Sequence, residues 1–404
     1  MMRRPVQAGL TLIEMMIAIL ISMILSIAVM SVMSSSEGRR RTLGSASDLD
    51  QTGSLAMYQM DRWIRSAGTG FVRTSASSYG CRLFASAGGT QLLPLTAALP
   101  APFATFTENT AATTDYRLAP VVIVSGGTTP SISGRPSDVL VMMATGNDGS
   151  QVPTPLKAPP QAAALSLKNF TEFSPNDLLL LVDGQPAAGG GPAPCLVSQA
   201  ASTTGTTGVG TSLSLAGTYY AATVNTRSVT DFTGNASAID LGGVNSGTGT
   251  SLPPNFQVVG VGDNNTLFSY DLLGLATPAL QAQAEGVFEI HAVYGIDSTG
   301  NSNNQINHWV KADSTSAYSA NNLTDGSAGA VQLLKNIRAV RLAIIMRTAL
   351  PERDASTTST PDTLTMFSDL ESGTIPFSRP MSAAEKLYRY RVIETTIPVR
   401  NNQY

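Results

Sequence analysis

The run GLTLIEMMIAILISMILSIAVMSVM, residues 9–33, governs the architecture of this chain. From Met15 to Met33 it contains no charged side chain. At a rise of 1.5 Å per residue, an α-helix over these positions is about 28 Å long. This length is close to the hydrocarbon thickness of a bilayer, so the sequence predicts a membrane-spanning helix.

A short leader precedes this helix. Residues 1–9 include two arginines, and the only evident processing point, between Gly9 and Leu10, lies ahead of the apolar run. Ordinary secretory signals place the cleavage site after the apolar stretch. Cleavage at Gly9 would leave the span attached to the mature chain. Positively charged residues usually flank the cytoplasmic end of a membrane span. The arginines of the leader and the three arginines at 39–41 lie at opposite ends of the span, so a count of charges does not set its orientation. We expect the leader in the cytoplasm.

Glu14 interrupts the apolar stretch one turn from its start. A carboxylate at membrane depth costs about 2.5–3.5 kcal/mol on insertion scales unless a partner compensates it. After cleavage, the new amine of Leu10 would lie one helical turn away on the same chain, or beside Glu14 of a neighbouring subunit in a packed bundle. Pairing between subunits would set their axial register. The alternative is that Glu14 reaches back to the headgroups as part of an ordinary signal anchor.

The hexapeptide Gly9-Leu10-Thr11-Leu12-Ile13-Glu14, with the apolar run behind it, resembles the prepilin signature of type IV pilins and type II secretion pseudopilins. The resemblance implies that a prepilin peptidase cleaves after Gly9. Leu10 would become the methylated mature N-terminus, and Glu14 would engage the N-terminus of a neighbouring subunit. Leu10 replaces the commoner Phe, which is a mild departure from the pattern.

Helical spacing continues beyond the span. Apolar or small residues recur at intervals of three or four, namely Leu43, Ala46, Leu49, Gly53, Ala56, Met60 and Ile64. This periodicity predicts an amphipathic continuation, and Gly68 is a suitable stop. One helix is therefore expected from about Leu10 to Ala67, the alternative being two helices broken near residues 34–38.

The rest of the chain is typical of strands separated by turn-rich loops. Candidate strands are residues 121–125, 138–143, 178–182, 256–261, 287–294, 340–347 and 388–399. Two of them alternate well, with Phe288, Ile290, Ala292 and Tyr294 on one face of the first, and Val340, Leu342, Ile344 and Met346 on one face of the second. Such alternation favours an antiparallel sheet with one covered face.

The expected fold class is α+β, a long N-terminal helix packed on a large antiparallel β-rich globular domain. Its parts are a leader (1–9), a transmembrane or filament-core helix (10–35), an amphipathic continuation (36–67) and the globular domain (68–404). Within that domain, residues 186–254 are rich in Gly, Ser and Thr. They predict surface loops or an inserted subdomain.

The chain has two cysteines, Cys81 and Cys195. Downstream of an export signal, an even pair predicts one disulfide. Closing so long a loop would stabilise the fold by roughly 4 kcal/mol. The alternative is two separate buried thiols, since free cysteine packs as a small hydrophobic residue.

Composition and motifs argue against catalysis, cofactors, metals and nucleic acid as the main partner. The net charge is -3, which gives no broad basic field for phosphate backbones. The two histidines, His291 and His308, belong to no metal-ligand pattern. His291 is expected to be a solvated or satisfied structural residue, on the strand face opposite Phe288 and Ile290. The polar run after Asp297 lacks the further carboxylates of a calcium loop, so a turn is the better interpretation.

Four further segments resemble the PilW family of minor pilins, namely residues 60–68, 285–297, 337–342 and 390–401. The resemblance implies a low-abundance minor pilin that helps to initiate type IV pilus assembly and lies at or near the tip. Its partners would be other minor and major pilins, the prepilin peptidase, the inner-membrane assembly platform and a PilY-type tip adhesin.

The same resemblance implies a single-pass inner-membrane protein with a periplasmic bulk, which moves to the cell-surface pilus on assembly. Two other interpretations stay open at this point. One is a type II secretion pseudopilin, from which the N-terminal motif cannot be distinguished. The other is a surface-binding module or enzyme that carries an ordinary signal anchor.

Overall fold

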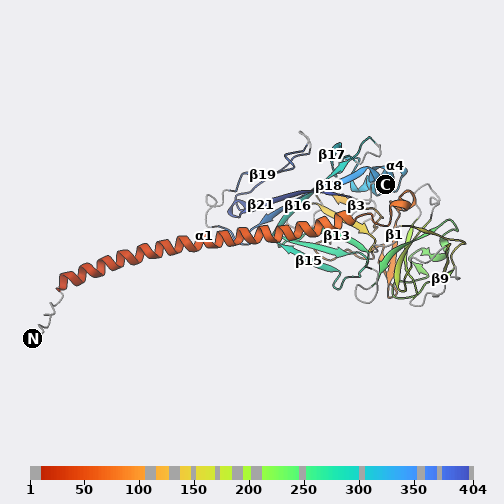
Figure 1. Ribbon diagram of the computed structural model, residues 1–404, viewed down its shortest axis with the longest axis horizontal. Helices are drawn as coiled ribbons and strands as arrows, with labels where there is room; N and C mark the ends of the chain where they lie inside the picture. The colour runs from red at the N-terminus through yellow and green to blue at the C-terminus, as the bar shows by residue number, and fades with distance from the viewer. Residues whose placement is uncertain are drawn as a thin grey trace, which may run out of the picture. The chain divides into compact units, whose positions relative to one another are not determined.

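One long helix begins the fold. The computed structural model describes residues 11–104, 115–126, 137–146, 152–168, 173–183, 194–201, 212–244, 252–299, 305–352, 360–370 and 375–399. Helix α1 (Leu12–Ser66) continues through residues 34–38 without a break (Figure 1), so the single-helix prediction is confirmed. It ends as predicted, because Gly68 adopts φ +81° and its N–H donates to the carbonyl of Met143 at 2.9 Å. Glycine takes this left-handed conformation without a Cβ penalty.

The chain divides into a helical unit, Met1–Gln51, and a large unit, Thr52–Tyr404. The described part of the large unit contains three main sheets. The strands of each sheet are given below in their spatial order, so that each strand is hydrogen-bonded to the next. The six-stranded sheet contains β2 (Thr90–Leu93), β1 (Leu83–Ala87), β8 (Cys195–Gln199), β7 (Asp177–Val182), β12 (Ser237–Gly243) and β5 (Thr154–Pro155). The five-stranded sheet contains β15 (Leu280–Glu285), β14 (Thr266–Asp271), β13 (Asn255–Val261), β4 (Val139–Ala144) and β3 (Val121–Val124). The four-stranded sheet contains β17 (His308–Lys311), β16 (Val287–Ile296), β18 (Ile337–Arg347) and β21 (Tyr390–Pro398).

Smaller elements complete the large unit. Three two-stranded sheets pair β19 (Thr363–Met366) with β20 (Phe377–Pro380), β10 (Thr223–Val224) with β11 (Arg227–Ser228), and β6 (Ala164–Ser166) with β9 (Ser212–Ser214). The short helices are η1 (Val72–Thr74), α2 (Ser75–Ser78), η2 (Val229–Asp231), α3 (Ala320–Leu323), α4 (Ala328–Asn336) and η3 (Glu385–Leu387). The α+β class with a large antiparallel β-rich domain is therefore confirmed, and each of the seven candidate strands coincides with an observed one.

The C-terminal part of α1 lies against the four-stranded sheet. Its predicted stripe is buried from Leu49 onward, with Ala56, Met60 and Ile64 at 0–1% exposure. A Cβ added at Gly53 would clash with the Ile393 side chain and come within 3.1 Å of Met346 Cγ. Glycine thus permits a close approach of the helix to β18 and β21.

The prediction that only one face of this sheet is covered was wrong. Every residue of β16 is buried, because the β19–β20 pair covers the face opposite α1. Residues of that pair join Val293, Ala343 and Ile345 in one apolar cluster. Phe288 also belongs to this cluster, not to the Ile290 face as predicted. A register shift between Val287 and Glu289 explains the change, since a β-bulge interrupts the alternation of side chains.

The six-stranded sheet has its own apolar core and occupies a separate part of the large unit (Figure 1). The described part of residues 186–254 contributes β8–β12, so this region is not made of loops alone. The limits of an inserted subdomain stay a prediction. One strand pair in the sheet, β1 with β8, is parallel.

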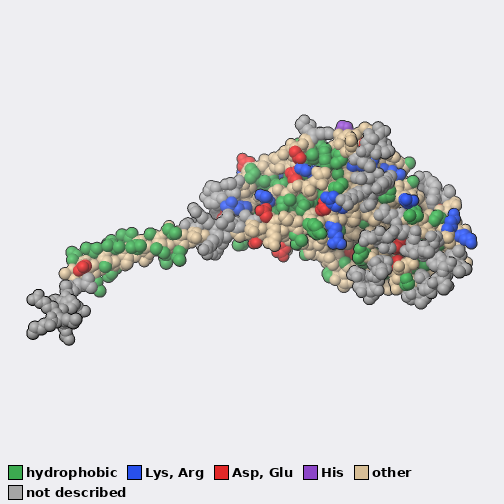
Figure 2. All heavy atoms as spheres, viewed as in Figure 1, with side chains coloured by type: hydrophobic (Ala, Val, Ile, Leu, Met, Phe, Trp, Pro, Cys, Tyr) green, Lys and Arg blue, Asp and Glu red, His purple; other side chains and the backbone are tan. Residues whose placement is uncertain are grey.

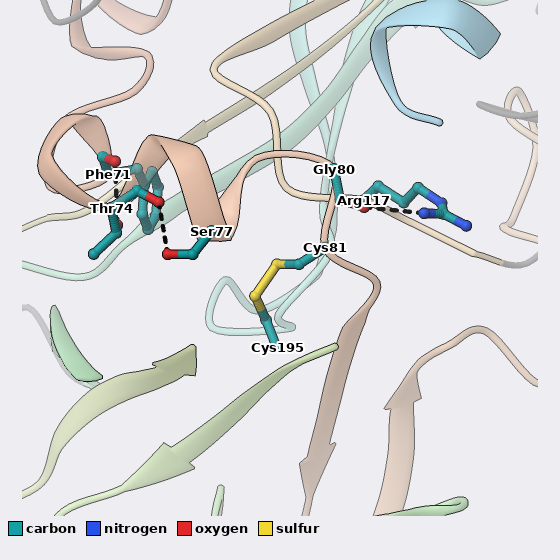
Figure 3. Close-up of a disulfide and its surroundings, with 7 residues drawn as sticks. All are labelled: Phe71, Thr74, Ser77, Gly80, Cys81, Arg117 and Cys195. Carbon is teal, nitrogen blue, oxygen red and sulfur yellow. Dashed lines mark hydrogen bonds between the residues drawn. A yellow bond between two sulfur atoms is a disulfide. The ribbon is translucent and has the colours of Figure 1, made fainter. Parts of the chain in front are cut away.

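The predicted disulfide is confirmed at the start of this sheet. Cys81 and Cys195 are bonded, with their Cα atoms 5.7 Å apart and both side chains fully buried (Figure 3). The bond lies beside the parallel pairing of Leu83 with Cys195. It closes a sequence separation of 114 residues, for which loop-closure entropy gives about 4–5 kcal/mol of stabilisation.

Candidate assembly interface

The N-terminal half of α1 presents an apolar surface without any cover in the described chain. Leu12–Met33 has a mean hydropathy of 2.6 and is 0% buried, and Figure 2 shows its hydrophobic side chains along the helix. It is long and apolar enough to cross a membrane by length and composition. A continuous apolar surface of this size marks a site for lipid or for other helices.

Two hydroxyl groups in this segment are satisfied within the helix. Ser22 Oγ donates to the carbonyl of Ile19, and Ser26 Oγ donates to the carbonyl of Ser22, both at 2.8 Å. Such back-bonding suits an apolar surrounding, where an unsatisfied polar group is costly. Glu14 is therefore the one ionisable side chain of Leu12–Met33 that needs a partner.

Glu14 lies in the first turn of α1 and is exposed. Its N–H and that of Met15 donate to the carbonyl of Thr11 at 3.1 and 3.2 Å. The N-terminal end of a helix favours a negative charge. No basic side chain within the described residues forms an ion pair with its carboxylate. Gly9 and Leu10 lie outside those residues, so cleavage, methylation and the intersubunit role of Glu14 stay predictions.

A second feature, which the sequence did not reveal, is a buried ionic network between β16 and β20. Arg379 Nε donates to Glu289 Oε1 at 3.0 Å, and its Nη2 donates to Glu385 Oε1 at 2.6 Å. Glu289 is 0% and Arg379 7% exposed. Burial alone would raise the pKa of Glu385, but the Ser382 N–H and the Arg379 guanidinium outweigh it and hold that pKa below its ordinary value. Buried charges persist only when they are paired in this way.

His291 adjoins the same network. Its Nε2 lies 3.3 Å from Glu289 Oε2 and its Nδ1 lies 4.0 Å from Asp138 Oδ2. The ring stacks on Phe377 with 4.2 Å between centroids and is 4% exposed. His291 is thus a satisfied structural histidine and not a solvated one. His308 is exposed on β17. In the described part of the chain, no group of three or more His, Cys, Asp or Glu side chains could hold a metal ion.

Comparison with known families gives two matches. Residues 260–401 match the family described as type IV pilus-assembly protein W, PilW, and residues 4–30 match the prokaryotic N-terminal methylation motif. The C-terminal third of the chain therefore matches a PilW-family pilin. The PilW match covers the four-stranded sheet, the β19–β20 pair and the buried network, whereas residues 60–68 lie outside it. No curated protein and no solved structure matches the chain.

The two matches fall on different parts of the chain. The methylation motif spans Glu14 and most of the apolar segment, as in a pilin anchored in the inner membrane. The four-stranded sheet, called the PilW-type sheet from here on, lies within the matched residues 260–401. Together they indicate a type IV pilus-related pilin, a structural protein that interacts with other pilus components.

Proposed function

We propose that this PilW-family pilin is a minor pilin that helps to initiate type IV pilus assembly and is incorporated at or near the tip. The observation that carries the proposal is the exposed apolar half of α1 with a single carboxylate at its start, on a chain that also has a PilW-type sheet. The helix first holds the subunit in the inner membrane, with the leader in the cytoplasm and the bulk in the periplasm.

Assembly would exchange lipid contacts for helix contacts. After the peptidase removes residues 1–9, the apolar half of α1 packs against helices of other pilins, because van der Waals packing drives helix association in membranes. Glu14 then finds its counter-charge in the N-terminal amine of a neighbour. No cofactor or catalytic group takes part in this mechanism.

The size of the large unit supports a terminal position. Beyond the PilW-type sheet it includes a six-stranded sheet with its own core, fixed by a buried disulfide. Repeating so large a unit at each step of a thin filament would crowd its neighbours. A few copies at the tip, next to other minor pilins, the major pilin and a PilY-type adhesin, avoid that crowding.

Two measurements test this function. Mass spectrometry of the protein from its native host should find a mature N-terminus at Leu10 with a methylated amine, and Gly9→Val should retain the leader. Immunogold labelling of sheared pili should place the protein at one end of the fibre. A product that still begins with Met1 contradicts the pilin mechanism, and uniform decoration along the shaft contradicts the tip position. A deletion that stops type II secretion but leaves pili intact favours a pseudopilin.

A further inference from the structure

A cavity of about 240 Å³ lies between the four-stranded sheet and the chain around β19 and β20. Its lining includes Asp138, His291, Lys311, Asp313, Phe367 and Phe377. Sites for drug-sized ligands are usually about 300–1,000 Å³, so this cavity suits a single side chain or a molecule of similar size. The cavity is open to solvent and has both charged and aromatic walls.

The buried carboxylate of this cavity belongs to Asp138, which is 4% exposed. Its Oδ2 accepts the N–H of Ala292 at 2.8 Å, and its Oδ1 accepts the N–H of Gly126 at 3.1 Å. The ionisable side chain beside it is His291, whose Nδ1 lies 4.0 Å from Asp138 Oδ2. In the described part of the chain no lysine or arginine pairs with Asp138, and burial raises the pKa of its carboxyl. Burial favours the neutral carboxyl, so a cation that enters the cavity would stabilise the ionised form, which has hydrogen bonds but no lysine or arginine partner among the described residues.

The other charges around the cavity leave this imbalance unchanged. Lys311 and Asp313 are both half-buried on the lining and carry opposite charges. Glu289, behind His291, is already paired with Arg379 at 3.0 Å. Among the described lining residues the charges of Lys311 and Asp313 offset each other, so an ionised Asp138 is the charge that a cationic ligand would neutralise.

Two aromatic rings complete the site. Phe377 stacks on His291, and Phe367 is 1% exposed. The backbone of Phe367 adopts φ +58°, which is unusual for a bulky residue, and its N–H donates to Glu394 Oε1 at 3.1 Å. Strained backbone held by neighbouring groups is concentrated at functional sites. Aromatic faces also attract cations within about 6 Å of the ring centroid.

We propose that this cavity binds the guanidinium group of an arginine side chain presented by a partner protein. A guanidinium is planar, matches a carboxylate with two N–H donors, stacks on aromatic rings and is more weakly hydrated than an ammonium. Asp138 supplies the carboxylate, while Phe367 and Phe377 supply the rings. The inference goes beyond the pilin function proposed above and does not depend on where the subunit lies in a fibre.

Calorimetric titration of the full mature chain in detergent micelles tests the proposal. The probe is N-acetyl-L-arginine amide, and the neutral isostere N-acetyl-L-citrulline amide is its control. We expect saturable binding of one arginine derivative per chain, and binding of the citrulline derivative at least tenfold weaker. Absence of saturable arginine binding, or equal affinity for both compounds, overturns the proposal.

Three variants locate the binding. Asp138→Asn should weaken arginine binding at least tenfold, and Ala312→Met, which fills the cavity from another position on its lining, should abolish it. Glu285→Gln, which changes an exposed carboxylate on β15, should bind as the wild type does. Near-ultraviolet circular dichroism checks folding, and Ala312→Met decides the matter if Asp138→Asn does not fold. Wild-type affinity in a folded Ala312→Met chain overturns the site.

A last comparison distinguishes the source of the guanidinium. A capped Gly-Arg-Gly tripeptide should bind with an affinity within about tenfold of that of the arginine derivative. Binding of agmatine without binding of the tripeptide overturns the assignment to a partner's side chain. A ¹⁵N spectrum in which His291 stays doubly protonated at pH 7, combined with no arginine binding, shows that Asp138 already has its cation and overturns the proposal as well.

Discussion

Arg379 on β20 donates to Glu289 on β16 across 3.0 Å, although 90 residues separate them in the chain. Both side chains are buried, and the pair joins the β19–β20 pair to the four-stranded sheet. The Arg379 guanidinium also lies 5.6 Å from the centroid of the Phe288 ring. This contact therefore holds together strands that the chain itself keeps apart.

Arg379→Met should lower the free energy of unfolding by about 3–5 kcal/mol, because the buried Glu289 loses its permanent counter-charge and keeps only His291 beside it. Urea unfolding of the chain in detergent, followed by circular dichroism, measures the change. The double variant Glu289→Gln/Arg379→Met should recover much of the loss, since neither charge then remains buried. A double variant as unstable as the single one contradicts this account of the pair.

Gly53→Leu should destabilise the large unit by about 1–3 kcal/mol through overpacking. The added side chain meets Ile393 and Met346 where α1 approaches the sheet. Gly44→Ala is the matched control, because a Cβ at Gly44 meets nothing within 4 Å. The control should be neutral or stabilise the helix by about 0.5–1 kcal/mol. Thermal unfolding compares the two variants, and equal melting temperatures would show that the approach is not close.

Alkaline pH should unfold the protein partly through Tyr390. Burial raises the pKa of Tyr390 to about 12 in the folded chain, above its ordinary value of 10. The unfolded chain then loses this proton more readily, so the contribution is intact below pH 10 and is lost as pH rises towards 12. Tyr390→Phe should show a shallower fall in stability across that window, measured by urea unfolding at each pH. Equal slopes for the variant and the wild type would contradict the buried phenol.

Glu14→Ala should leave export and leader cleavage intact but reduce incorporation into pili several-fold. The physical reason is that the carboxylate is the one charge of the apolar half of α1 available to a neighbour's amine. Immunoblots of sheared pili and of membranes measure the two pools. Asp48→Ala, which removes an exposed acid further along α1, is the control and should assemble normally. Normal incorporation of Glu14→Ala would count against pairing between subunits.

The spacing of apolar residues was enough to predict the helix and strands in which that spacing is regular. The apolar run, the stop at Gly68 and three strands of the four-stranded sheet, β16, β18 and β21, depend on neighbours in sequence and were predicted from spacing, whereas the four-residue β17 was not. The β19–β20 pair escaped notice, because four-residue strands such as Thr363–Met366 carry too little periodicity. Phe288 was placed on the wrong face because a bulge depends on the pairing between strands, which alternation in one strand does not contain.

Composition, spacing and residue counts were enough to predict that an apolar helix with one acid follows the short leader and that a β-rich domain comes after it, whereas the pairing of the two cysteines, expected from their even number, was decided by the structure. The meeting of Glu289, His291, Asp138 and Arg379, and the cavity beside them, emerged only from the folded chain. Contacts between groups separated by 90 or more residues depend on how the sheets pack, and no local pattern records which distant side chains packing will bring together.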